Sequence, residues 1–343
     1  MQVQINSVSW SDKLKWTCLI EDHINKSVYQ SPMIYDFYKS VKFYTPYVFI
    51  IKNHADEING VLLAVLIKES SGIKGLLSSR VLIFGGPIIA QHIENKKEVL
   101  DGLLTQLVKT LKNKSIFIQF RNFFDWNEEE INVFAKHGFV FRDRQNILLK
   151  LKGRIDVLRN MSESKRRQIR IATKNGSVIR PPDSVDEVKS FYFILKDLYR
   201  NQIRKPLPDF SFFEEFYKGT KKGLGIIKLV VFNNEIIGGV LAPITTDKTI
   251  YYWYVAGLDR EYKNNYPSVM AVWALIDYGL KHNIKELDFM GIGKANQNYG
   301  VRDFKMRFSK EIIDYGRFGR RNNKLLYKVA EFGYNILREV KKV

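Results

Sequence analysis

Cationic side chains gather in one stretch near the middle of the 343-residue chain, "SESKRRQIRIATKNG" (162–176). On a helix of about 3.6 residues per turn, four of them fall within one arc of roughly 100°: Arg166, Arg167, Arg170 and Lys174. Such a face suits the phosphates of a nucleic acid, an anionic membrane or a phosphorylated substrate, and it also serves solubility alone. The charge by itself leaves these four interpretations open.

The excess of positive charge is uneven along the chain. Lys and Arg number 55 against 36 Asp and Glu, which gives a formal charge of +19. Residues 162–180 hold six cations and one acid, and residues 317–343 hold eight cations and two acids. Clustering of this kind favours a polyanionic partner over a nonspecifically basic surface.

Several classes of site are excluded by composition. The single cysteine, Cys18, excludes a disulfide framework and a cysteine-based zinc cluster, and the five histidines show no metal-binding spacing. No GxxxxGK(S/T) phosphate loop occurs. We therefore expect no metal and no cofactor. The longest aliphatic run, "VLLAVLI" (61–67), is too short for a membrane span, and the amino terminus lacks the apolar core of a secretory signal. These features predict a soluble cytoplasmic protein.

The segment 251–280 joins an aromatic strand to a helix through a polar loop. Pro267 suits the first position of the helix. Free N–H groups at that helix start, beside Asn265 and Ser268, would seat an anionic or carbonyl-bearing group. Because side chains alternate along a strand, only one of Trp253 and Tyr254 is expected to line a cleft. An ordinary strand-to-helix connection is the alternative interpretation.

A carboxylate, Asp288, lies within the apolar strand "ELDFMG" (286–291). Flanked by Leu287 and Phe289, it is a candidate buried acid that holds or deprotonates an amine. Pairing with a neighbouring base is the alternative.

The order of predicted elements repeats once along the chain. In each half, helices precede an antiparallel meander whose last strand leads into a helix and another strand. This repetition predicts two α/β units, residues 1–152 and 153–320, each with a mixed, mostly antiparallel sheet flanked by helices. The segment "EIIDYGRFG" (311–319) is predicted as one strand, and a helix is predicted from about 323 to 341.

Nearly the whole chain, from about residue 29 to 320, resembles the Fem family, whose members have two acetyltransferase-fold (GNAT) domains in tandem. The resemblance rests on "YQSPMIYDFYKSVK" (29–42), "FGGPII" (84–89), the junction 146–176, the block 251–293 and "VRDFKMRFS" (301–309). The family implies aminoacyl or acyl transfer to a primary amine, which forms an amide without ATP. The second unit would carry the transfer site.

The resemblance also implies roles for individual residues. Lys305 would stabilise the oxyanion that forms when an amine attacks an ester carbonyl, with Arg307 on the same strand face and Asp288 completing the catalytic group. The acyl donor would contact a set on the strand, loop and helix start: Trp253, Tyr254, Val255, Ala256, Gly257, Asn265, Pro267 and Ser268. The acceptor and its phosphates would contact a second set: Lys39, Lys42, Arg166, Arg167, Arg170, Tyr199 and Arg204.

The leading hypothesis is therefore a peptide-bond-forming transferase, with an aminoacyl-tRNA donor and a lipid-linked cell-wall or envelope precursor as acceptor. An alternative is N-acylation of an amino sugar or amino acid, with acyl-CoA or an acyl carrier protein as donor. Against CoA, the acyl-CoA-binding signature of ordinary acetyltransferases is degraded here to "REYKNNYPS" (260–268). The non-enzyme alternative is an RNA-binding protein that keeps the fold without the chemistry.

The predicted terminal helix carries an apolar stripe flanked by cations. The stripe comprises Leu325, Val329, Phe332, Ile336 and Val340. Docking on the first unit is the interpretation we favour. Peripheral association with an anionic membrane, at its inner face, is the alternative.

Overall fold

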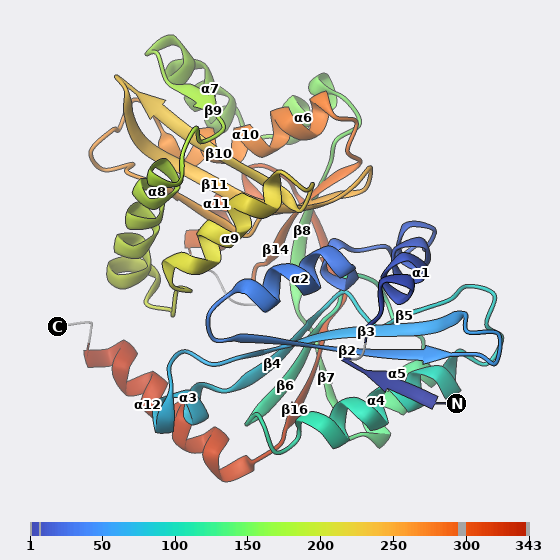
Figure 1. The fold of residues 1–343 in the computed structure, drawn as a ribbon. Helices are drawn as coiled ribbons and strands as arrows, with labels where there is room; N and C mark the ends of the chain where they lie inside the picture. Colours follow the sequence, from blue (N-terminus) through green and yellow to red (C-terminus); the bar gives the residue numbers. More distant parts are fainter. Residues whose placement is uncertain (1, 7, 294–299, 341–343) are drawn as a thin grey trace. The chain divides into compact units, whose positions relative to one another are not determined.

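The computed structural model describes residues 2–6, 8–293 and 300–340, and the side chains of 333–340 are outside this description. The chain forms two units, Met1–Asp143 with Tyr315–Val343, and Arg144–Asp314 (Figure 1). Within these described residues, each unit contains one mixed eight-stranded sheet flanked by helices.

The first unit is built on a sheet whose two faces are covered by different helices. Its strands, in sheet order, are β1 (Gln2–Ile5), β2 (Tyr44–Lys52), β3 (Ile58–Ile67), β4 (Arg80–Phe84), β6 (Phe117–Arg121), β16 (Arg317–Arg321) and β7 (Val140–Arg142), with β5 (Ile88–Ile89) paired to β3. Its helices are α1 (Trp10–Glu21), α2 (Pro32–Ser40), α3 (Gly72–Ser78), α4 (Lys96–Leu111), α5 (Glu128–Lys136) and α12 (Lys324–Val340), with a 3-10 turn η1 (Val28–Gln30). Alternate strand residues such as Phe49 and Ile51 pack with Leu103 and Phe134 of α4 and α5. Figure 1 shows α1 and α2 on the other side of this sheet.

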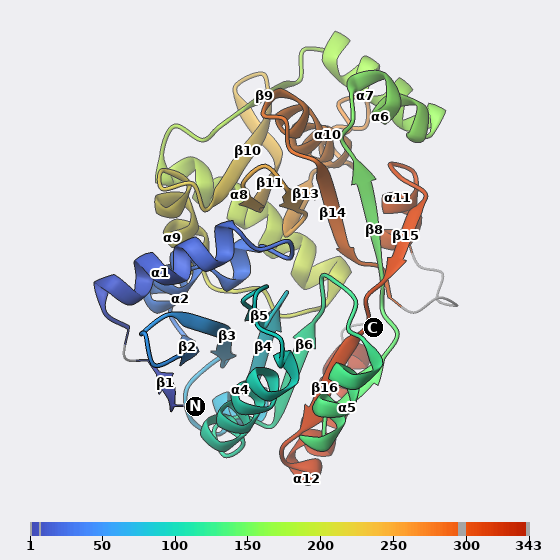
Figure 2. The same cartoon turned by 90° about the vertical axis from the view of Figure 1, so that its right-hand side faces the viewer.

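The second unit follows the same layered plan. Its strands, in sheet order, are β15 (Glu311–Asp314), β8 (Gln145–Lys150), β14 (Glu286–Gly291), β12 (Thr249–Tyr251), β11 (Glu235–Thr245), β10 (Gly225–Phe232) and β9 (Val178–Arg180), with β13 (Tyr254–Gly257) paired to β11. Its helices are α6 (Arg154–Asn160), α7 (Glu163–Lys174), α8 (Val185–Leu198), α9 (Phe210–Thr220), α10 (Pro267–Lys281) and α11 (Gly300–Met306), with a π-helical turn η2 (Tyr199–Ile203). Helix α10, apolar on nearly every side, packs on one face with residues of α6 and α7, while α8 and α9 contact the other strand faces (Figure 2).

The sheet of the second unit opens between β13 and β14. Strand β12 pairs in parallel with β14, with Ile250 opposite Leu287. Strand β13 begins three residues after the end of β12, and it pairs with β11, with Val240 opposite Val255. Among the described residues, β13 has no ladder to β14. Within the described part of the chain, no strand therefore pairs with β13 on the side of this opening.

Two strands belong to a different unit from the one that the sequence predicted: β8 lies in the second unit and β16 in the first. Residues 145–150 form β8 in the second sheet, whereas the sequence assigned them to the first unit. The segment predicted as one strand, 311–319, is two strands in different sheets: β15 pairs with β8, and β16 pairs with β6 and β7. Gly316 separates them with a φ of +63°, a left-handed conformation that breaks the strand.

Candidate functional site

A buried ammonium and a buried carboxylate lie where β14 ends. Asp288 on β14 is 3% exposed and Lys305 on α11 is 5% exposed. Lys305 Nζ donates to the carbonyl of Phe289 at 2.6 Å and approaches the carbonyl of Gly291 at 3.4 Å. An ammonium has three donor hydrogens, so this arrangement leaves one for another acceptor.

The pKa values of the two groups move toward each other. Burial raises the pKa of Asp288 to about 7, although the Met290 N–H and the charge of Lys305 favour its ionised form. Burial lowers the pKa of Lys305 to about 8, and the charge of Asp288 opposes this shift. Both groups therefore titrate near neutral pH, as groups that exchange protons during catalysis do.

Two residues that the sequence analysis missed complete the surroundings of this pair. Asn146 on β8 is 9% exposed, and its amide lies 3.3 and 3.4 Å from the carboxylate oxygens of Asp288. The ring centre of Tyr252 is 4.8 Å from Lys305 Nζ, within cation–π range. An amide within the otherwise apolar strand "NILLKL" is a signal that could have marked Asn146, because buried polar groups need partners.

The turn η2 also belongs to these surroundings. Lys205, the second residue after it, carries a charge that lowers the pKa of Lys305. Arg204 has a φ of +54°, and its N–H donates to the carbonyl of Tyr199 at 2.8 Å. Burial raises the pKa of the Tyr199 hydroxyl to about 12. A π-helical turn that ends in a left-handed non-glycine residue is a strained arrangement of the kind that occurs at functional sites.

The sequence predicted that Arg307 shares a strand face with Lys305, and this prediction is wrong. Residues 300–306 form the helix α11, and Arg307 follows its end with an exposed side chain. Two positions along a helix are roughly 200° apart, so the two cations point in different directions. The carbonyl of Arg307 accepts from Ser162 at 2.8 Å, which links α11 to the start of α7.

Trp253 and Tyr254 both face α9, so the predicted alternation across the strand is wrong. The ladder is interrupted between Tyr251 and Tyr254, which removes the period of two. Ring centres lie 5.0 Å apart for Trp253 and Phe212, and 5.2 Å apart for Tyr254 and Phe213. These aromatic side chains pack against α9, while Val255 and Ala256 continue the ladder with β11.

The start of α10 is less open than predicted. Pro267 is the first helical residue, as expected, but the Ser268 N–H already donates to Asp259 Oδ1 at 3.1 Å. A Cβ on Gly257 would lie 2.4 Å from the Ser268 nitrogen, so strand and helix meet in close contact. Asn265 is buried and donates to the hydroxyl of Ser177 at 3.0 Å. The Asp259 carboxylate thus occupies the helix start where the sequence predicted that an external anionic or carbonyl group would bind.

The cationic face of α7 forms as predicted. Arg167, Arg170 and Lys174 are exposed and Arg166 is half-buried. Within the described part of the chain, none of these four side chains forms an ion pair. The face is therefore available to an external polyanion.

Lys165, also on α7, points inward instead. It is 6% exposed, and its Nζ lies 2.9 Å from Gln168 Oε1 and 4.5 Å from the ring centre of Phe304, which is next to Lys305 on α11. Burial and the charge of Arg307 lower the pKa of Lys165 to about 8. Helix α7 thus contributes to the packing around α11.

Lys39 and Lys42 lie in the first unit, each above an aromatic ring. Lys39 Nζ is 5.7 Å from the ring centre of Tyr35, and Lys42 Nζ is 5.0 Å from that of Phe43. Both lysines are exposed. Their predicted contact with the acceptor stays a prediction.

The apolar stripe of α12 is exposed in the described part of the helix. Leu325 is 71% exposed, Val329 48% and Phe332 68%, so the prediction that this stripe docks on a core is wrong for these three residues. The helix contacts the first unit through other residues: the ring of Tyr327 lies 5.6 Å from that of Phe117, and α12 adjoins α3. Lys341 and Lys342 fall outside the described residues. No helix among the described residues is both long and apolar enough to cross a membrane.

Known proteins resemble this chain in sequence and in fold. A family model described as "FemAB family" matches residues 233–335. "Aminoacyltransferase FemA" of Staphylococcus epidermidis is 21% identical, over 85% of this chain and 89% of that protein. The crystal structure of FemX matches with a TM-score of 0.70 at 16% identity, over 96% of this chain and 99% of that one. A tandem GNAT protein from the clavulanic acid biosynthesis pathway matches with a TM-score of 0.57 at 11% identity, over 94% and 99%.

These matches confirm three predictions from the sequence: the resemblance to the Fem family, the fold of two tandem acetyltransferase-like units, and the class of enzyme, an acyltransferase. The matched region 233–335 contains Asp288, Lys305 and the opening between β13 and β14.

Proposed function

We propose that this Fem-like chain transfers an aminoacyl group from aminoacyl-tRNA to a primary amine of a lipid-linked peptidoglycan precursor or a similar envelope precursor. The observation that carries the proposal is the buried pair of Asp288 and Lys305 beside the opened sheet, within the region that matches the FemAB family. Titration of both groups near neutral pH suits a reaction that must deprotonate an amine and stabilise an oxyanion.

The proposed reaction forms one amide bond and breaks one ester bond. The neutral amine attacks the ester carbonyl, and the negative charge that develops on the carbonyl oxygen accepts the third hydrogen of the Lys305 ammonium. Collapse of this intermediate breaks the C–O bond to the donor ribose. The proton that the amine loses ends on the leaving hydroxyl, so no oxidant, metal or nucleotide triphosphate enters the balance.

Asp288 has the second role in this proposal. Its carboxylate is held by the Met290 N–H at 2.6 Å and faces the amide of Asn146. With a pKa raised to about 7, it can accept a proton from an incoming ammonium and release it to solvent before the next turnover, while the proton lost in the attack goes to the leaving hydroxyl. Arg204 and Tyr199, at the strained turn η2, are proposed to position the acceptor.

Two features support tRNA over CoA as the donor. The exposed cations of α7 offer several contacts to nucleic acid phosphates. At the start of α10, the Asp259 carboxylate occupies the Ser268 N–H and would repel the diphosphate of CoA. N-acylation from a thioester donor remains the alternative, and an RNA-binding protein without chemistry is the non-enzyme alternative.

One assay separates these proposals. Purified protein is incubated with radiolabelled aminoacyl-tRNA or with labelled acyl-CoA, each with an extract of lipid-linked precursors, and the label that becomes alkali-stable amide is followed. Amide from aminoacyl-tRNA under single-turnover conditions is the expected result. Label transferred from acyl-CoA alone would favour the thioester alternative, and binding of tRNA without any amide would favour the non-catalytic one.

We also propose that the protein works in the cytoplasm, at an anionic membrane surface. The support is the exposed stripe Leu325, Val329 and Phe332 on α12, accompanied by the exposed cations Lys324 and Lys328. Ile73 on helix α3, which adjoins α12, is also 78% exposed. Apolar side chains beside lysines are what a helix lying on anionic lipids requires.

A further inference from the structure

The outer edge of β10 is only partly covered in the second unit. Strand β9 pairs with residues 229–231 of β10 and ends at Arg180. Pro181 and Pro182 follow, and prolines cannot donate to a ladder. Among the residues that the structure describes, no strand pairs with the outer edge of β10 at 225–228.

The ladder on the inner side shows which main-chain groups face this edge. The Ile244 N–H donates to the carbonyl of Leu224 at 3.2 Å, so Leu224 points toward β11. Because the bonding direction alternates along an antiparallel strand, Ile226 and Lys228 also point toward β11. Gly225 and Ile227 therefore direct their N–H and C=O groups outward. Gly225 lies opposite Pro243, which has no N–H and cannot donate to Gly225. This agrees with the outward direction of the Gly225 main-chain groups.

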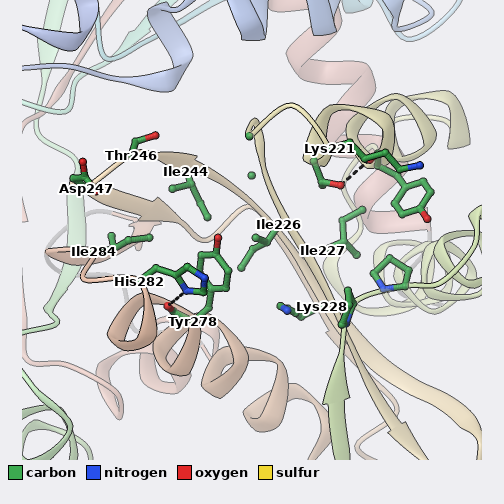
Figure 3. Close-up of a pocket in the computed structure, with 16 residues that line it drawn as sticks. Lys221, Ile226, Ile227, Lys228, Ile244, Thr246, Asp247, Tyr278, His282 and Ile284 are labelled. Atoms are coloured by element: carbon green, nitrogen blue, oxygen red, sulfur yellow. Dashed lines mark hydrogen bonds between the residues drawn. The ribbon is translucent and has the colours of Figure 1, made fainter.

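A cavity of about 550 Å³ lies along this edge, between the end of α9 and the end of α10 (Figure 3). It has walls on both faces of the sheet. On one face Ile226 and Lys228 meet Tyr278 and His282 of the α10 end, and on the other Ile227 lies toward Lys221. None of the residues predicted for aminoacyl transfer lines this cavity. A groove that straddles an unpaired strand has the shape that an added strand would fill.

The groove carries cations beside an aromatic surface. Lys228 Nζ lies 5.7 Å from the ring centre of Tyr278, and that ring stacks on His282 with centres 3.8 Å apart. Burial and the neighbouring Lys281 lower the pKa of Lys228, and the charge of Asp277 opposes this shift. Within the described residues, neither Lys221 nor Lys228 forms an ion pair. Asp247 also lines the cavity, but Figure 3 shows it at the opposite end from Lys228.

We propose that this groove binds an extended acidic peptide, which adds to β10 as a strand beyond the end of β9. Main-chain groups of the peptide would pair with Gly225 and Ile227, as in other cases of strand addition to a sheet edge. A carboxylate of the peptide would pair with Lys228, and a neighbouring apolar side chain would rest on Ile226 and Tyr278. None of the proposed transfer residues lines the groove, so it would recruit a partner protein through an acidic extended segment without taking part in the chemistry.

The proposal is tested with a fluorescein-labelled hexapeptide of alternating glutamate and valine and with the same peptide N-methylated at alternate amides. We expect the unmodified peptide to bind, and the N-methylated one to bind about tenfold more weakly, because it cannot complete the ladder. Lys228→Met should weaken binding by roughly fivefold, whereas Lys222→Met, an exposed neighbour that does not line the cavity, should leave it unchanged. Aminoacyl transfer by either variant should equal that of the wild type.

Hydrogen exchange gives the decisive readout. Bound peptide should slow exchange at the Gly225 and Ile227 amides by at least about tenfold, with little change at Ile226 and Lys228, whose amides already pair with β11. Three outcomes would overturn the proposal: no binding of the unmodified peptide, equal binding of the N-methylated peptide, which indicates a site for anions alone, or protection that rises with protein concentration without peptide, which indicates self-association.

Discussion

Lys305 is anchored to the residue that follows Asp288: its Nζ donates to the carbonyl of Phe289 at 2.6 Å. The two charged residues are therefore held by one strand end, and each counteracts the effect of burial on the pKa of the other. Such a pair keeps both ionisation states accessible near neutral pH.

Replacement of Lys305 should abolish transfer without loss of RNA binding. Lys305→Met removes the donor proposed for the oxyanion, and the loss of one such donor costs about 100- to 1000-fold in kcat. Single-turnover amide formation and tRNA affinity are the two measurements. The exposed Lys310→Met is the matched control and should retain full rate. An unaffected rate in Lys305→Met would remove Lys305 from the mechanism.

Asp288 should make the protein less stable as the pH rises toward neutrality. Its pKa is raised in the folded state, from 3.8 to about 7, so the folded state holds a proton that the unfolded state releases. The stability linked to this proton is present below pH 4 and is lost as the pH rises through 7, on the order of 4 kcal/mol. Urea unfolding at pH 4.5 and 7.5 measures it. Asp288→Asn should flatten the dependence, whereas the exposed Asp303→Asn should not.

Asn146 should set the acid limb of the pH–rate profile. Its amide favours the ionised form of Asp288, so Asn146→Leu should raise the pKa of Asp288 further and move the acid limb of kcat/KM upward from about pH 7. A shift of roughly half to one pH unit is expected. Asn146→Ser keeps a donor and should shift the limb less. A limb that stays in place in Asn146→Leu would mean that Asp288 does not govern it.

The exposed face of α7 should contribute to tRNA binding through phosphates. Replacing Arg167, Arg170 and Lys174 together by Gln should weaken tRNA binding and lower the slope of log affinity against log salt by roughly 2. The control is a triple replacement of exposed lysines in the first unit, Lys96, Lys97 and Lys112. Equal salt-dependence slopes for the two triple variants would mean that α7 contributes only to the net charge of the protein and makes no direct phosphate contacts.

Exposed apolar residues of α12 should bind anionic lipid. Leu325→Ser with Phe332→Ser should reduce sedimentation with vesicles of phosphatidylglycerol and phosphatidylcholine by about tenfold or more, since each buried apolar side chain contributes roughly 1.5–3 kcal/mol. Trp10→Ser, which replaces an equally exposed aromatic residue on α1, is the control. Sedimentation that is unchanged in the double variant would leave α12 without a part in membrane binding.

Local patterns in the sequence determined the fold class, the basic helix α7 and the start of α10 at Pro267, because periodicity, charge and proline act over a few neighbouring residues. The same patterns identified Asp288 as a carboxylate within an apolar strand. They did not reveal that residues 311–319 divide between two sheets, since the partners of β15 and β16 lie far away along the chain.

The site itself was decided by tertiary structure. Lys305 became a buried ammonium only because α11 packs against the end of β14, and Asn146 reached Asp288 through the pairing of β8 with β14. Burial and pairing change the free energy of a charge by several kcal/mol, and both depend on contacts between segments that are distant in sequence. The sequence determined which residue types could do the chemistry, and the packing decided which of them are poised to do it.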